Sequence, residues 1–205
     1  DFGTNRIPGE PRDIAPYWRD VGTVDSYYEA NMELRSPVPS MNLYNRNWRI
    51  RTAQRDYPPA LCVHHNRDYR PCTSQDSMVC EGSIVQGSRL NRVILGYDCF
   101  LGNGSEVEDS LLLSGCDVCD GARRRRVLFD KNCRIEPGTE IGVDPEADRE
   151  RFPWITPGGV VVLPKGTVVP RQGPIRFAFD MAELLEADKD VGPQLDAWDG
   201  RYDVS

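Results

Sequence analysis

The sequence predicts a mainly β protein built around a left-handed parallel β-helix. Between residues 77 and 142, aliphatic residues recur every five or six positions, and glycine follows several of them, as in Leu95-Gly96 and Leu101-Gly102. A helix has a period of 3.6 residues and a half-buried strand a period of two, so neither explains this spacing. In a parallel β-helix, each six-residue unit forms one side of a triangular coil, and stacked coils bury their aliphatic residues together.

One aliphatic or aromatic residue from each unit should fill the interior of this β-helix. These residues are Val79, Ile84, Leu90, Leu95, Leu101, Val107, Leu112, Val118, Phe129, Ile135 and Ile141. The alternative is an ordinary antiparallel β domain with a turn about every six residues. The rhythm persists over more than sixty residues, which favours the β-helix.

Arg124 is an exception to this pattern, because it lies six residues after Val118 and therefore at an inward position. An unpaired guanidinium buried among aliphatic side chains would be costly. We therefore expect either that Asp117, Asp120 or Asp130 pairs with Arg124, or that the coil shifts its register locally.

The chain divides into four expected parts: residues 1–35 (a loop and a short helix), residues 36–76 (a linker), residues 77–170 (the β-helix) and residues 171–205 (a C-terminal helix and tail). The short helix should include Glu29 to Leu34 and end before Pro37. Within the β-helix part, Asp144 to Phe152 is a charged insertion that precedes further strand.

Apolar residues in the linker and tail indicate how these parts would pack. The linker lacks a sustained period, and its expected anchors on the rest of the fold are Trp48, Ile50, Tyr57 and Leu61. The expected C-terminal helix is amphipathic, with apolar residues at Phe177, Met181, Leu184 and Leu185.

Composition argues against nucleic-acid and membrane partners. The net charge is -7, and most basic residues are interspersed with acidic ones, whereas nucleic-acid binding needs a positive face. No stretch approaches the roughly 18 apolar residues that span a bilayer. The first residues lack the basic and apolar regions of a signal peptide, although the chain reads as part of a longer protein.

Cysteine usage favours a reducing cytoplasm. The seven cysteines are an odd number and are scattered along the chain. Cys116 and Cys119 have the spacing of a metal or redox pair, but a structural zinc site needs four ligands and no second such pair exists. Free thiols in a β structure are therefore the simpler interpretation.

Several segments, in a fixed order, resemble the C-terminal part of bacterial glucose-1-phosphate adenylyltransferases (ADP-glucose pyrophosphorylases). They are Tyr17-Trp18-Arg19-Asp20-Val21-Gly22-Thr23, then Trp48-Arg49-Ile50-Arg51-Thr52, then residues 121–142, and then residues 144–165. The first resembles the end of the catalytic domain, the second the linker with Arg49 in place of a proline, and the others the last coils of the β-helix.

The resemblance implies an enzyme that makes ADP-glucose and pyrophosphate from ATP and glucose 1-phosphate in glycogen biosynthesis, with Mg2+ as cofactor. Asp20 would be a catalytic residue and metal ligand, since nucleotidyl transfer needs charge neutralised on phosphate oxygens. Trp18 would help to shape the same pocket. The family's glycine-rich phosphate loop and glutamate-lysine motif are not in this sequence, and a segment that the family has between the positions of Pro8 and Pro16 is missing. The isolated chain is therefore expected to be inactive.

The resemblance also implies a homotetramer regulated by an anionic effector. Lys131 and Lys165 match basic positions of the family's effector cleft, and Arg123, Arg125 and Arg126 lie on the same coil as Lys131. Arginine offers phosphate a bidentate geometry, so these five residues are the expected effector-binding residues. A solvated charged face is the alternative interpretation of the cluster.

Two other functions fit parts of the sequence. A non-catalytic regulatory or assembly module would use the β-helix alone, since its open ends and edges need capping or pairing. A hexapeptide acyltransferase would need a histidine between coils as general base. Its only candidates, His64 and His65, precede the repeats, which makes this alternative the weaker one.

Overall fold

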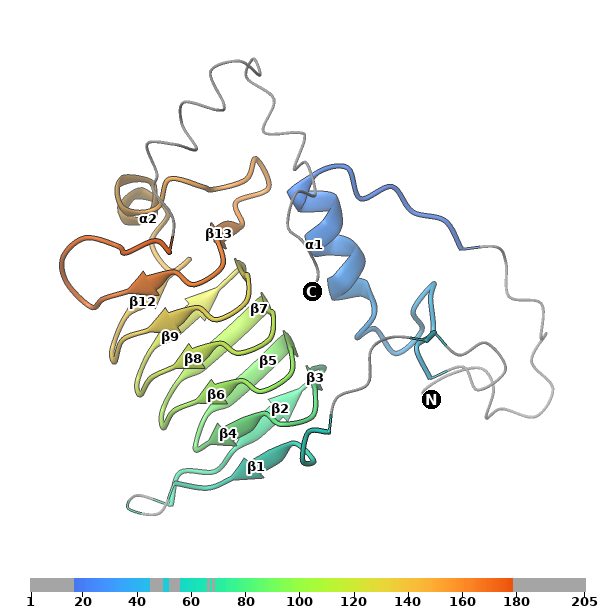
Figure 1. Cartoon of the computed structure of the whole chain (residues 1–205), viewed down its shortest axis with the longest axis horizontal. Coiled ribbons are helices and arrows are strands. Elements are labelled where there is room, and N and C mark those ends of the chain that lie inside the picture. Colours follow the sequence, from blue (N-terminus) through green and yellow to red (C-terminus); the bar gives the residue numbers. More distant parts are fainter. Residues whose placement is uncertain (1–16, 45–49, 52–55, 66, 68, 179–205) are drawn as a thin grey trace.

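The computed structural model describes residues 17–44, 50–51, 56–65, 67 and 69–178, and it confirms the parallel β-helix (Figure 1). The helices are α1 (Val24–Glu33) and α2 (Pro145–Arg151). The strands are β1 (Leu61–Val63), β2 (Thr73–Gln75), β3 (Met78–Val79), β4 (Ile84–Gln86), β5 (Arg89–Leu95), β6 (Phe100–Leu101), β7 (Glu106–Leu112), β8 (Asp117–Val118), β9 (Arg123–Arg125), β10 (Val127–Phe129), β11 (Arg134–Ile135), β12 (Glu140–Ile141), β13 (Val161–Leu163) and β14 (Val168–Val169).

The coils stack as a three-sided prism. Face 1 carries β2, the first halves of β5 and β7, β9 and β12, whereas face 2 carries β3, the second halves of β5 and β7, β10 and β13. Face 3 is the six-stranded sheet β1-β4-β6-β8-β11-β14. All strand pairs in the three faces are parallel, and partners such as Val107 and Arg124 are one coil apart. Equivalent residues therefore form columns that run along the prism.

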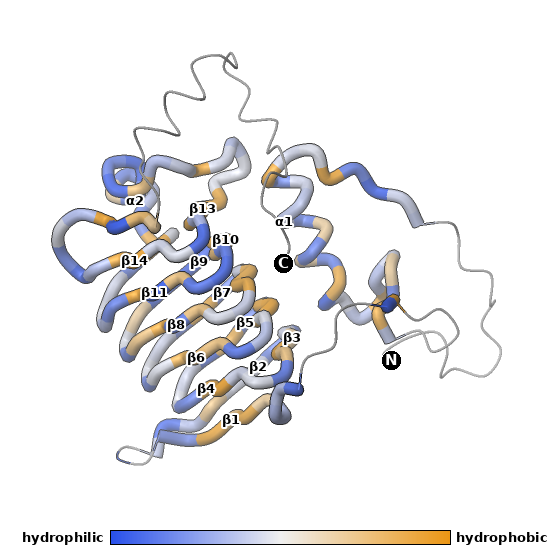
Figure 2. Tube along the Cα trace, viewed as in Figure 1, coloured by the Kyte–Doolittle hydropathy of each residue, from blue (hydrophilic) through white to orange (hydrophobic). Residues whose placement is uncertain are grey.

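Each face contributes one buried column to the interior. The columns are Leu90, Val107, Arg124 and Ile141 on face 1, Leu95, Leu112, Phe129 and Leu163 on face 2, and Val85, Leu101, Val118, Ile135 and Val169 on face 3. Figure 2 shows hydrophobic segments repeating from coil to coil. Ile84 corrects the prediction: it is 39% exposed, and its neighbour Val85 occupies the interior instead. Val79, near the first coil, is half-buried.

Buried serines at the corners of the prism donate hydrogen bonds to backbone carbonyl oxygens. Ser88 donates its hydroxyl to the carbonyl oxygen of Gly102 at 2.5 Å, and Ser105 donates to that of Cys119 at 2.9 Å. Each bond links a corner to the next coil, and both serines are fully buried. Buried polar groups are costly unless they are paired, so these hydroxyls stabilise both the turn and the stack.

Helix α1 covers the outer side of face 2 (Figure 1). Thr23 caps its N-terminus by accepting from the backbone N–H of Ser26. Tyr28 and Met32 are buried in a cluster with Leu111 and Leu128, so the face 2 strands are apolar on both sides. The Tyr28 hydroxyl also donates to the backbone oxygen of Asp109 at 2.5 Å. The helix begins before the predicted run of Glu29 to Leu34.

The charged insertion contains helix α2 and lies between face 1 and face 2 of the last coil. Phe129 pairs with Leu163 in the next coil, although the number of residues between them is twice that between Leu112 and Phe129. The extra residues form α2 and the loop that follows it. Asp144 caps α2 by accepting from Glu146 and Ala147, and proline occupies the first turn. After the helix Phe152 returns to the interior cluster, where it is 3% exposed.

The prism begins upstream of residue 77, because β1 pairs with β4 from Leu61 onwards. Of the expected anchors, Tyr57 stacks on Tyr97 with ring centroids 5.6 Å apart, whereas Ile50 and Leu61 are about half exposed. Trp48 lies outside the described residues, as do Met181, Leu184 and Leu185 of the expected C-terminal helix.

Arg124 is inside the prism without a partner, which contradicts both expectations for it. The register is unshifted, since Arg124 pairs with Val107 on one side and Ile141 on the other. It is 2% exposed, and its three guanidinium nitrogens have no hydrogen-bond partner among the described residues. Its carbon atom Cζ lies 5.9 Å from the centroid of the Phe129 ring, a cation–π contact. Burial lowers the pKa of Arg124 to about 9.

Replacing this arginine should therefore stabilise the fold. We expect Arg124→Leu to raise the free energy of unfolding at pH 7 by about 2–4 kcal/mol, because an uncompensated buried charge is removed from an aliphatic column. Urea unfolding monitored by circular dichroism measures the change, with Arg134→Leu on the exposed side of face 3 as the control. A less stable Arg124→Leu variant would contradict the absence of a partner.

The stabilisation by Arg124→Leu should shrink at alkaline pH. The pKa of Arg124 is about 9 when folded and 12.5 ordinarily, so between these values the unfolded chain binds more protons. The penalty for Arg124 is therefore full below pH 9 and declines as pH rises above it. Unfolding free energies of wild type and variant at pH 7 and pH 10.5 should show a smaller difference at pH 10.5.

Candidate functional site

Asp20 and Trp18 lie in the extended segment that leads into α1. An oxygen of Asp20, Oδ1, accepts from the backbone N–H of Gly22 at 2.9 Å, and the residue is exposed. Trp18 is 84% exposed. Asp20 thus presents one carboxylate to solvent, which suits Mg2+ bound by one or two carboxylates together with substrate phosphates. No group of three His, Cys, Asp or Glu side chains in the described part of the chain could hold a metal ion alone.

Asp25 in the first turn of α1 fastens the helix to the loop that follows α2. Its carboxylate accepts from the hydroxyl of Thr156 and, at 2.9 Å, from the backbone N–H of Gly158. The carbonyl oxygen of Gly158 in turn accepts from a guanidinium nitrogen of Arg126 at 2.6 Å. Gly158 therefore joins the segment carrying Asp20 to a corner of the prism. Sequence reasoning did not identify Asp25, and nothing in its local motif distinguishes it.

Lys131 and Lys165 lie together at the corner between face 2 and face 3. The backbone N–H of Gly166 donates to the carbonyl oxygen of Lys131 at 2.9 Å, which places the two lysines at equivalent positions of neighbouring coils. Both side chains are exposed. The charge of Asp130 at this corner reaches Tyr27 of α1, and burial, with a smaller effect of Asp130, raises the pKa of Tyr27.

The three expected effector arginines lie away from these lysines. Arg123 and Arg125 are on the outer side of face 1, and Arg126 is at the corner between face 1 and face 2. Arg123 bridges Glu106 at 3.6 Å and Glu140 at 3.4 Å. The five expected residues therefore form two groups on different edges of the prism, and one small ligand could not contact both.

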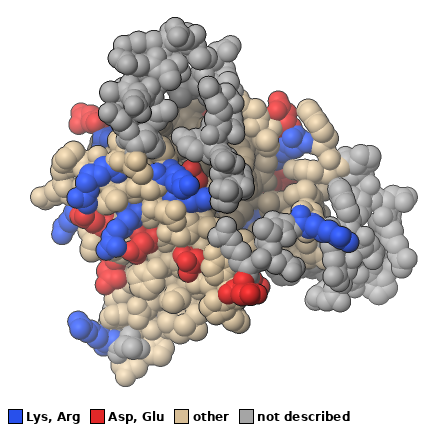
Figure 3. All heavy atoms as spheres, in the orientation of Figure 1, with Lys and Arg blue, Asp and Glu red and all other residues tan. Residues whose placement is uncertain are grey.

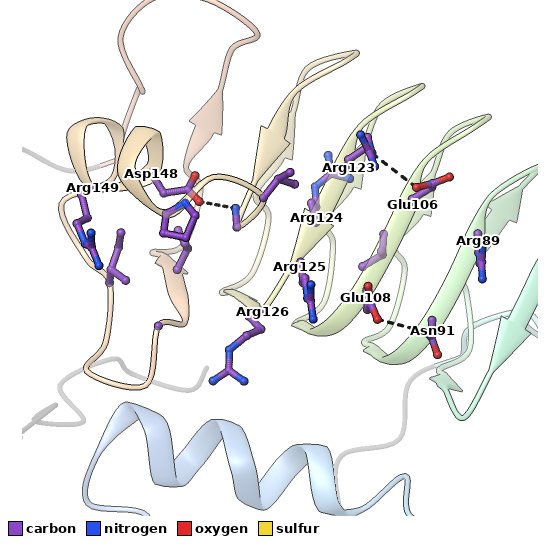
Figure 4. Close-up of a pocket in the computed structure, with 17 residues that line it drawn as sticks. Arg89, Asn91, Glu106, Glu108, Arg123, Arg124, Arg125, Arg126, Asp148 and Arg149 are labelled. Carbon is purple, nitrogen blue, oxygen red and sulfur yellow. Dashed lines mark hydrogen bonds and ion pairs between the residues drawn. The ribbon is translucent and has the colours of Figure 1, made fainter.

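The arginines line a hollow of about 630 Å³ between face 1 and α2, here called the arginine pocket. Figure 3 shows basic side chains gathered in this part of the surface, and Figure 4 shows the pocket itself. Its charged lining residues are Arg89, Glu106, Glu108, Arg123, Arg124, Arg125, Arg126, Asp148 and Arg149. The arginines outnumber the carboxylates, so the pocket is positive.

Gly142 lines the arginine pocket, and its backbone packs closely against that of Arg125. It follows β12 and occupies the position next to Arg125, where a Cβ atom would lie 1.7 Å from the Arg125 carbonyl oxygen. No side chain can therefore stand there. The chain then leaves the prism for α2, and the Asp148 carboxylate accepts from the backbone N–H of Gly142 at 2.9 Å. Burial raises the pKa of Asp148.

The two cysteines with metal-like spacing do not act as a pair. Cys116 is buried and donates its thiol to the carbonyl oxygen of Asp130 at 3.2 Å, whereas Cys119 is half-buried beside Asp117. All seven cysteines belong to the described residues and are free thiols. Within the same residues, neither α1 nor α2 is long and apolar enough to cross a membrane.

A triangular prism of six-residue units defines the class of hexapeptide-repeat β-helix proteins. The chain belongs to the GlmU-like, C-terminal hexapeptide family, whose sequence pattern matches residues 58–163.

Within this broad family, the chain is similar to one kind of enzyme. The chain is 40% identical over 184 residues to a glucose-1-phosphate adenylyltransferase of Arthrobacter sp. (strain FB24), covering 90% of this chain and 39% of the relative. It is 45% identical over 163 residues to the same enzyme of Geobacter metallireducens, covering 80% of this chain and 39% of the relative. The match is to the C-terminal part of these enzymes, so the chain spans about two fifths of their length.

The contacts of Asp25 predict that α1 is held by the α2 loop. We expect Asp25→Ala to lower the free energy of local opening of α1 by about 1–3 kcal/mol, because two hydrogen bonds to a charged acceptor are lost. Hydrogen exchange of the α1 backbone amides measures this. Glu29→Ala, on the same helix but with a side chain 67% exposed, is the control. Equal exchange in both variants would show that the Asp25 contacts do not hold the helix.

Proposed function

We propose that this chain is the C-terminal regulatory and oligomerisation part of a glucose-1-phosphate adenylyltransferase. The parent enzyme would convert ATP and glucose 1-phosphate into ADP-glucose and pyrophosphate in glycogen biosynthesis. The observation that carries the proposal is the 40–45% identity to enzymes of that name over most of this chain. The chain alone is proposed to be inactive, because it matches only about two fifths of those enzymes.

In this proposal α1 is the end of the catalytic domain, and its docking on face 2 positions Asp20. The tie from Asp25 to Gly158 fixes the first turn of the helix, and Asp20 lies only three residues before the cap at Thr23. The exposed Asp20 carboxylate would help to hold Mg2+, which neutralises charge on the reacting phosphates when bound. The exposed Trp18 would line the substrate pocket together with the rest of the catalytic domain.

The proposed effector position is the pair Lys131 and Lys165. The two ammonium groups are exposed at one corner, on neighbouring coils and beside α1. Two cations on a rigid support attract an anion such as a sugar phosphate or nucleotide. An anion there would lie between the prism and the helix that leads to Asp20, which is a suitable place for regulation.

A homotetramer and a cytoplasmic location complete the proposal. The outer side of face 3 carries an apolar column of Leu61, Ile84 and Phe100, which are 49%, 39% and 37% exposed. Exposed apolar columns on a β-helix suit contacts between subunits.

Seven free thiols suit a reducing compartment.

Reconstitution tests the proposed catalytic role. We expect co-expression with the N-terminal part of the Arthrobacter relative to produce ADP-glucose from ATP, magnesium and glucose 1-phosphate, with neither part active alone. Asp20→Asn should reduce the rate by at least about a hundredfold, because a carboxylate that holds the metal is lost. Asp98→Asn, at an exposed prism corner, should leave the rate unchanged.

An inactive complex, once its assembly is shown by gel filtration, would contradict the catalytic proposal. It would indicate a non-catalytic regulatory β-helix subunit instead. Full activity of the Asp20→Asn complex would contradict the role of Asp20 alone.

The lysine pair should control the response to effectors. In the active reconstituted complex, Lys131→Gln with Lys165→Gln should raise the concentration of a sugar phosphate, AMP or phosphate needed for half-maximal response by about tenfold or more. The reason is that two charge-assisted contacts to phosphate are removed. Rates measured without effector provide the control and should change little.

A further inference from the structure

The arginine pocket is a separate site from the lysine pair and faces a different side of the molecule. Arg125 lies at the end of a polar column on face 1, where its neighbour in the preceding coil is Glu108. The Glu108 carboxylate is already engaged by Arg92 at 2.6 Å and by Asn91 at 3.3 Å. On the other side Arg125 meets Gly142, which has no side chain.

The other carboxylates of the arginine pocket are also engaged. Glu106 pairs with Arg123, and Asp148 accepts from the backbone N–H of Gly142. Arg125 and Arg149 have no ion pair with any described residue; both are exposed and line the pocket, Arg125 from β9 and Arg149 from the α2 side (Figure 4). Two unpaired guanidinium groups, one from β9 and one from α2, therefore share one hollow.

Arg124 adds a second and independent reason to expect an anion. Its guanidinium is 2% exposed and unpartnered among the described residues, and the residue belongs to the wall of the arginine pocket. A buried charge is poorly screened by water, so its positive potential reaches the pocket surface. The three carboxylates of the pocket are each engaged by a neighbouring group, and six arginines outnumber them, so the pocket keeps a positive potential.

We propose that the arginine pocket binds a phosphate group of a small phosphorylated metabolite. Arg125 and Arg149 contact the phosphate oxygens, since guanidinium matches phosphate in a bidentate geometry. Gly142 packs its backbone against that of Arg125, so no side chain from this position neighbours the Arg125 guanidinium. Arg124 contributes through its potential and touches no ligand. This site does not depend on the proposed catalytic function.

Titration of the 205-residue chain with inorganic phosphate at low salt tests the site. In ¹⁵N–¹H spectra, the Gly142 amide and the arginine side-chain Nε–H signals should shift in a saturable manner. Arg125→Gln with Arg149→Gln should weaken phosphate binding at this site by about tenfold or more, because two charge-assisted contacts are lost. Lys131→Gln with Lys165→Gln removes the same charge elsewhere and should change it less than about twofold.

Three outcomes would overturn the proposal. They are no saturable shift at Gly142 in the wild type, equal weakening by the two double variants, which would indicate general electrostatic attraction, or weakening by the lysine variant alone. Arg149→Gln by itself guards against misfolding, because Arg149 is an exposed residue of α2 without an ion pair among the described residues. It should keep the wild-type melting temperature and still weaken phosphate binding.

Discussion

The structure depends on the parallel pairing that keeps equivalent residues of successive coils in register. Backbone N–H and C=O groups of one coil bond those of the next, so pairing satisfies the backbone and aligns the side chains at the same time. A shift of one residue would move the interior column to the outside. Insertions are therefore confined to corners, and the α2 segment enters at such a corner without disturbing the pairing of Phe129 with Leu163.

Arg124 shows how strong this constraint is. The strand β9 keeps its register with both neighbours although this places a charged group in the interior. Slipping the strand would expose Arg124 but would also bury Arg123 or Arg125 in its place. The whole stack therefore tolerates one unfavourable residue, as is expected when the pairing energy is shared along a quasi-one-dimensional array.

The fold could be predicted from the sequence because aliphatic residues recur at a constant spacing along the β-helix. Leu101, Val118 and Ile135 recur at the interval of a coil, and all are fully buried. Ile84 was misassigned because Val85 is equally apolar, and spacing alone cannot choose between adjacent aliphatic residues. The doubled aliphatic residues of face 2, such as Leu111 and Leu112, carried a signal for a covered outer side.

The candidate sites were harder to predict than the fold. Sequence resemblance pointed to Lys131 and Lys165, and the structure places these two residues on neighbouring coils. Arg125 was grouped with them by nearness in sequence, but a six-residue step turns the chain onto another face of the prism, so Arg125 lies apart from the two lysines. The α2 helix could have been recognised from Asp144 followed by proline, which is a strong N-terminal signal. The role of Asp25 depends on its contacts with Thr156 and Gly158, which are far from it in the sequence.

Three buried cysteines at the corner between faces 2 and 3 would show where the coils separate. Cys99, Cys116 and Cys133 occupy equivalent interior positions of three successive coils, and each donates its thiol to a carbonyl oxygen of the neighbouring coil. Contacts with the neighbouring thiols and burial raise the pKa of Cys99 and Cys116, so both stay protonated and unreactive while covered. A thiol reagent reaches each sulfur only when its coil separates from the next. The order of alkylation would thus report from which end the stack frays.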